Sequence, residues 1–434
     1  MIYNIIHIVH FNGGDNMLRL IQFEIIKICK STFFRIMMIG FLLFILTYFT
    51  YVYINTVRAD DLIINLESMM FTQEQHLQEL YDVLESNEGE SDRETEQSIE
   101  TWERFQERDS KLLQAYEEED WTTIMELEIE QYEPGVEMLR NDPYQNVYTW
   151  PTFFSKETLL AQYKWIRDRE ITPVLRIEEF AWKTAYDEVF DDPIGEEIVK
   201  ENSIKYSSAG VHFLKSVFQM LFSLIGAILF LFLFADVVTK EGLGRNGPIH
   251  LLKTQPIHRQ KILVSKFMTV IIVSFMTLLI TAILSIMLGV IFDRLGDWDY
   301  PVLIYGEERT FTYMNLGTYL LQSFGLFFMI LLFCYSILFL FSVITKKTLI
   351  ALGLTLATII IGITWSKESV LSSFAPYIPF HYFSVGEVIT NELAVTLEDF
   401  TFSFANGMIS FGVVSLGVLF MTFVIFVVQS KYSN

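Results

Sequence analysis

Seven histidines, two cysteines and two rows of polar side chains are the residues whose types could support chemistry. The histidines are scattered, and none belongs to the H-E-x-x-H motif of zinc proteases; no G-x-S-x-G motif occurs either. Cys29 and Cys334 lie in or beside apolar segments, without disulfide or metal-ligand spacing. We therefore predict no catalytic, cofactor-binding or metal site, which disfavours membrane-enzyme chemistry.

The two polar rows recur at helical spacing inside apolar stretches. Small and hydroxyl residues at this spacing let membrane helices pack closely, and they could instead line a path for a polar solute. Packing is the favoured interpretation, and a substrate path is the alternative. The rows comprise Gln219, Ser223 and Gly226 in one stretch, and Ser274, Thr277, Thr281 and Ser285 in another.

The elements that must position these side chains are strongly apolar. The 434 residues are 52% hydrophobic and only 19% charged, against about 25% charged in soluble domains. A membrane span needs roughly 20 apolar residues. We predict an all-α polytopic membrane protein with six transmembrane helices, the fourth and sixth stretches including interfacial chain. The stretches without Asp, Glu, Lys or Arg are 36–57, 216–235, 267–292, 310–345, 348–366 and 400–430.

Charges sort between the segments that connect the stretches. If both termini are cytoplasmic, the inner segments hold 13 Lys/Arg against 4 Asp/Glu, and the outer ones hold 18 against 48. The positive-inside rule favours this orientation, in a bacterial plasma membrane. With a net charge of -21, the chain is not expected to bind nucleic acid, which needs a basic face.

The first 57 residues divide into a possible leader and an anchor. We predict that 17–35 forms an amphipathic helix in the inner membrane interface, with Ile21, Ile25 and Ile28 on one face; a plain extension of the first span is the alternative. Residues 1–16 are a possible non-native leader, because their codons could hold a ribosome-binding sequence before Met17.

Residues 58–210 are expected to form an acidic α-helical extracytoplasmic domain, with 14 Lys/Arg against 38 Asp/Glu. Asp120 is placed to cap a helix that starts at Trp121, and Glu133-Pro134-Gly135 is typical of a turn that ends it. Ser155 is a candidate start for a further helix. Residues 211–434 then carry spans two to six, with a cytoplasmic loop at 236–266 and an outer loop at 367–399.

The loop 236–266 has the features of a small rigid surface held close to the membrane. Gly242 to Pro248 cannot continue a helix smoothly, a short amphipathic helix can follow, and Pro256 ends it. Arg259, Lys261 and Lys266 then lead into the third span. Such a loop suits docking of a cytoplasmic partner, and a passive connector with inside-facing positive charge is the alternative.

This loop resembles the corresponding loop of ABC-2 type transporter permeases, which show an acid, a Gly, a Leu-Leu pair, a Pro, an Arg and a Lys in this order. Six spans and the lead-in helix also match, and Tyr377–Phe383 resembles the family's stretch of short re-entrant half-helices. One departure is Pro248, where the family usually has Thr or Ser. The matching loop residues are Glu241, Gly247, Leu251, Leu252, Pro256, Arg259 and Lys266.

The resemblance implies a permease subunit that pairs with itself or a similar chain and is powered by a separate cytoplasmic ATPase. In agreement, the sequence has no G-x-x-x-x-G-K-[ST] phosphate loop, so we expect this chain to bind no cofactor and its partner to use ATP. Within the loop, the candidate ATPase contacts are Glu241, Gly247, Leu251, Leu252, Pro256, Arg259 and Lys261. The alternative function is a membrane sensor whose acidic outer domain detects an extracellular ligand.

Overall fold

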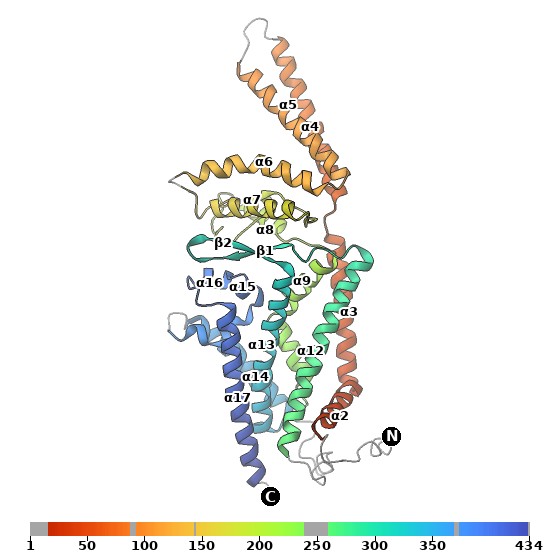
Figure 1. The fold of residues 1–434 in the computed structure, drawn as a ribbon, viewed down its shortest axis with the longest axis vertical. Helices are drawn as coiled ribbons and strands as arrows, with labels where there is room; N and C mark the ends of the chain where they lie inside the picture. Colours follow the sequence, from red (N-terminus) through yellow and green to blue (C-terminus); the bar gives the residue numbers. More distant parts are fainter. Residues whose placement is uncertain (1–15, 87–92, 143–144, 238–258, 369–372, 433–434) are drawn as a thin grey trace. The chain divides into compact units, whose positions relative to one another are not determined.

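The computed structural model describes residues 16–86, 93–142, 145–237, 259–368 and 373–432 (Figure 1). These residues form two compact units. The span unit comprises the described parts of Met1–Phe49, Leu214–Leu288 and Thr318–Asn434. The insert unit comprises the described parts of Thr50–Phe213 and Gly289–Gly317. The proposed leader 1–16 lies outside the described residues, apart from Asn16 at the start of the first helix.

Long apolar helices dominate the span unit. In the described part of the chain, five helices are long and apolar enough to cross a membrane, or six if one bent pair counts as a span. The prediction of several membrane spans is therefore confirmed. The helices are α3 (Thr32–Asn55), the bent pair α9 (Gly210–Leu221) and α10 (Leu224–Phe234), α12 (Arg259–Phe292), α13 (Leu316–Thr345), α14 (Thr348–Glu368) and α17 (Phe404–Tyr432).

The second span differs from the single helix predicted over 216–235. It begins earlier, at Gly210, and α9 and α10 meet at a 75° bend. Ser223 ends the break as the N-cap position of α10, and its hydroxyl donates to the Met220 carbonyl oxygen at 3.0 Å. The charge-free stretch could not reveal the bend, because it runs across the break without a charged residue.

The fourth and sixth charge-free stretches both include residues outside the long helices, as the prediction of extra chain in them requires. Residues Phe311–Asn315 form strand β2 before α13 begins, and α17 begins only at Phe404. β2 pairs antiparallel with β1 (Pro301–Tyr305). The fold is mostly helical but includes this β-hairpin, which the all-α prediction omitted.

Short helices connect α14 to α17, as the resemblance implied for Tyr377–Phe383. They are η3 (Ala375–Tyr377), η4 (Pro379–Phe383), α15 (Val385–Ile389) and α16 (Glu392–Thr396). A Cβ on Gly362 of α14 would lie 2.5 Å from the Phe380 ring. The Ser410 hydroxyl of α17 donates to the Tyr377 carbonyl oxygen at 2.7 Å. The segment is therefore packed between two long helices.

The insert unit is built mainly from helices, drawn in orange and yellow in Figure 1. Asp120 caps α6 as predicted, accepting from the Thr123 amide at 3.2 Å. The predicted end of this helix at Pro134 is wrong, because α6 continues to Arg140. The capping residue of α7 is Thr152, not Ser155. The helices are α4 (Ala59–Ser86), α5 (Arg93–Glu117), α6 (Trp121–Arg140), α7 (Phe153–Asp168) and α8 (Pro193–Ser203), with the short η1 (Glu179–Ala181).

Candidate coupling site at the ends of the 238–258 segment

The lead-in helix α2 (Asn16–Lys30) buries a stripe at i, i+4 spacing that contains a charge. Leu20, Glu24 and Ile28 are all buried. Ile28 is buried as expected for the apolar face, whereas Ile21 and Ile25 are only half-buried. Glu24 lies within the buried stripe. A carboxylate in such a position needs a cationic partner, because an unpaired buried charge is strongly unfavourable.

Lys266 of α12 provides that partner. Its Nζ lies 3.7 Å from Oε1 of Glu24, and the two side chains are only 5% and 4% exposed. The same Nζ donates a hydrogen bond of 2.7 Å to the carbonyl oxygen of Val237. Lys27, which is 34% exposed, approaches the other Glu24 oxygen at 3.6 Å. Three segments of the chain therefore meet at the Lys266 ammonium group.

The meeting point lies at both ends of the predicted docking loop. Val237 is the last described residue before the 238–258 segment, and α12 begins with Arg259. Lys261 is exposed on the first turns of α12. Lys266 was predicted to end the loop and lead into the third span, but its contact with Glu24 was not predicted. The other candidates, Glu241, Gly247, Leu251, Leu252 and Pro256, lie outside the described residues.

The polar row on α12 is buried along its whole length. The hydroxyls of Thr277, Thr281 and Ser285 each donate to the backbone carbonyl four residues earlier, at 2.8–2.9 Å. Ser274 instead bonds the Tyr335 hydroxyl of α13 at 2.6 Å. These hydroxyls are satisfied within the helices themselves. In the other row, Gln219 is exposed and Ser223 is half-buried, so the two rows have different surroundings.

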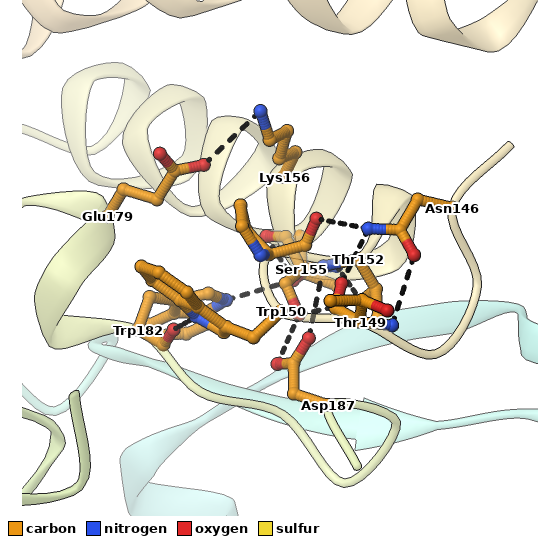
Figure 2. Close-up of polar contacts among 11 residues, drawn as sticks. Asn146, Thr149, Trp150, Thr152, Ser155, Lys156, Glu179, Trp182 and Asp187 are labelled. Atoms are coloured by element: carbon orange, nitrogen blue, oxygen red, sulfur yellow. Dashed lines mark hydrogen bonds and ion pairs between the residues drawn. The ribbon is translucent and has the colours of Figure 1, made fainter. Parts of the chain in front are cut away.

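A buried polar network that the sequence did not reveal lies in the insert unit, where Figure 2 shows Asp187 beside the start of α7. Its carboxylate accepts from the Thr152 amide at 3.1 Å, the Ser155 hydroxyl at 2.5 Å and the Thr184 amide at 2.7 Å. Charge-assisted hydrogen bonds of this kind are strong. The Asp187 carboxylate accepts each of these hydrogen bonds, so the network holds the segments at Thr152 and Thr184 against α7 and has a structural role.

Several apolar helices long enough to cross a bilayer define a multi-pass membrane protein. Lys266 of α12 contacts Val237, the last described residue before the segment 238–258. The chain belongs to the ABC-2 transporter family: the family model described as "ABC-2 family transporter protein" matches residues 20–430. No curated protein and no solved structure matches the chain.

Membership of this family makes the chain a membrane subunit of a transporter, of a kind that is typically not catalytic. The match runs from within α2 almost to the end of α17, and so includes the insert unit as well as the spans. The family resemblance of the loop and the family model therefore agree.

Proposed function

We propose that this ABC-2 membrane subunit is the permease half of an ATP-driven exporter, which pairs with itself or a similar chain and is powered by a separate cytoplasmic ATPase. The observation that carries the proposal is the family match over 20–430 in a chain without a phosphate-binding loop. The energy of ATP must then come from another polypeptide, which has to contact this one.

The charge distribution supports an inward-facing contact surface. The loop 236–266 holds six Lys/Arg against two Asp/Glu, and the segment 58–210 is strongly acidic, which together favour cytoplasmic termini and an extracytoplasmic insert. The proposed ATPase contacts are Glu241, Gly247, Leu251, Leu252, Pro256, Arg259 and Lys261.

Affinity purification of the full chain from its native membranes tests the proposal. We expect an ATPase with a phosphate-binding loop to be recovered with the wild-type chain. Arg259→Glu together with Leu252→Asp should lower that recovery at least about tenfold, because an apolar and a charged anchor of an interface each contribute on the order of 1–2 kcal/mol. The amount of inserted permease should stay unchanged.

Lys347→Glu is the matched control, since Lys347 is exposed in the short α13–α14 connection and is predicted to lie on the same side of the membrane. It should leave recovery of the ATPase unchanged. Normal recovery with the double variant would show that the loop is not the docking surface. Absence of any ATPase with the wild-type chain would contradict the proposed function itself.

A further inference from the structure

We propose that Glu24 and Lys266 are positioning residues that carry an ATP-driven displacement of α12 and of the end of α10 to the lead-in helix α2 and, through it, to the first span. This inference rests on the proposed function, because the ATPase is the source of the movement. The geometry points to it through one atom: Lys266 Nζ contacts Glu24 of α2 at 3.7 Å and Val237, immediately before the segment, at 2.7 Å.

Burial makes separation of the Glu24 and Lys266 side chains energetically costly. Both side chains are at most 5% exposed, and separating them would leave two charges in a poorly solvated place. Surface ion pairs exchange readily with water and ions, whereas this pair has little water to exchange with. A displacement of Lys266 or of the end of α10 should therefore take Glu24 with it.

The joint between α2 and α3 (Thr32–Asn55) can pass the movement on. Only Ser31 separates the two helices, and backbone hydrogen bonds run through it: the Ser31 amide donates to Ile28 at 2.9 Å, and the Arg35 amide donates to Ser31 at 3.1 Å. The Arg35 side chain adds a bond of 3.0 Å to the Cys29 carbonyl oxygen. Three hydrogen bonds thus brace the single-residue connection, so α2 is not a freely hinged arm.

A purely structural role predicts a different response to substitution. A buried ion pair can often be replaced by apolar residues of similar size without loss of stability. Glu24→Leu with Lys266→Met should therefore leave a folded permease that lacks the link to Val237. If the pair only stabilises the fold, this double variant should behave as the wild type does.

The native thiol of Cys29 provides a readout that needs no knowledge of the transported substrate. Cys29 is exposed on α2, five residues after Glu24, whereas Cys334 is buried. The labelling rate of Cys29 by a membrane-impermeant maleimide can be measured in inverted vesicles that contain the full chain and its co-purified ATPase, with and without Mg-ATP. We expect Mg-ATP to change the wild-type rate at least twofold.

The double variant should lose this response while its thermal midpoint and its recovery of ATPase remain those of the wild type. Lys27→Gln is the matched control: Lys27 approaches the same carboxylate at 3.6 Å, but it belongs to α2 itself and is 34% exposed, so its variant should keep the full response. Lys266→Arg, which preserves the charge, should keep at least half of it.

If the double variant is not produced as a folded protein, Glu24→Gln replaces it, and the response should fall at least twofold. A full response in these variants would overturn the inference, as would a wild-type chain that recovers its ATPase but shows no ATP-dependent labelling change. A wild-type chain that recovers no ATPase would instead overturn the proposed function, so the two failures are distinguishable.

Discussion

Gly226 is the residue on which the bend of the second span depends. A Cβ at this position would lie 1.8 Å from the carbonyl oxygen of Leu221, which is backbone and cannot swing away. Any side chain must therefore open the 75° angle between α9 and α10. The bend therefore requires that residue 226 has no Cβ.

We predict that Gly226→Ala destabilises the folded protein by at least about 2 kcal/mol, at the upper part of the range for overpacked sites. The measurement is the thermal midpoint of the full chain in detergent. Gly353→Ala on α14 is the control, because a Cβ there meets nothing within 4 Å, and it should be neutral or slightly stabilising. Equal midpoints for both variants would show that the bend is not rigid.

Single residues also show where sequence patterns reach their limit. The N-cap role of Asp120 followed from local spacing, because its partner Thr123 is three residues away. Glu24 and Asp187 have partners that are distant in sequence: Lys266 is more than 200 residues from Glu24, and Thr152 is 35 residues from Asp187. An acid in an apolar helical stripe was the only local signal of the Glu24 contact.

At the scale of elements, an ion pair between α5 and α6 includes a buried carboxylate whose protonation affects the stability of the fold. Nη2 of Arg108 lies 3.1 Å from Oε1 of Glu128, and Nη1 of Arg108 lies 3.4 Å from Oδ1 of Asp109. Burial raises the pKa of the Glu128 carboxyl, and the nearby acids Glu178 and Asp109 add to this, while the Arg108 guanidinium offsets only part of it. The surroundings of Glu128 therefore disfavour the charged form of its side chain.

A raised pKa in the folded state means that folding favours the protonated form of Glu128. The stability it contributes is fully present below its ordinary pKa and is lost as pH rises through the raised value. We predict that Glu128→Gln flattens the fall in stability over this pH range relative to the wild type. Denaturation of the full chain can be followed by its tryptophan fluorescence, to which Trp102 on α5 and Trp121 on α6 contribute.

Glu126→Gln serves as the control, since Glu126 lies on the same helix but is exposed. Its pH dependence should follow that of the wild type. A Glu128→Gln profile with the wild-type slope would show that this carboxyl does not titrate differently in the folded and unfolded chains.

The membrane-spanning helices were predictable because a single property, the length of a charge-free stretch, identifies them. Long charge-free stretches identified the spans, because a bilayer requires about 20 apolar residues of any order. The end of α6 was not predictable in this way: Val136, buried just after Pro134, and the packing of α6 against α7 keep the helix going. Tertiary contacts there outweigh the local cost of Pro134 and Gly135.

At the scale of the whole molecule, the family match and the sorting of charge lead to the same account. The span unit carries a bundle of apolar helices whose α12 polar row is satisfied internally, and the acidic residues concentrate in the insert unit. Nothing in the bundle's sequence supplies a phosphate-binding loop. Under the proposed function, energy enters through a contact with another protein, and the 238–258 segment is the proposed place of that contact.

The central claim is that this segment receives an ATPase, and photo-crosslinking tests it most directly. A photoreactive residue in place of Leu252, activated in native membranes, should give an adduct that mass spectrometry identifies as a protein with a phosphate-binding loop. The same residue in place of Tyr377, in the predicted outer loop, should give none. An adduct from position 377 but not from 252, or reaction of position 252 only with reagents added outside intact cells, would contradict the account.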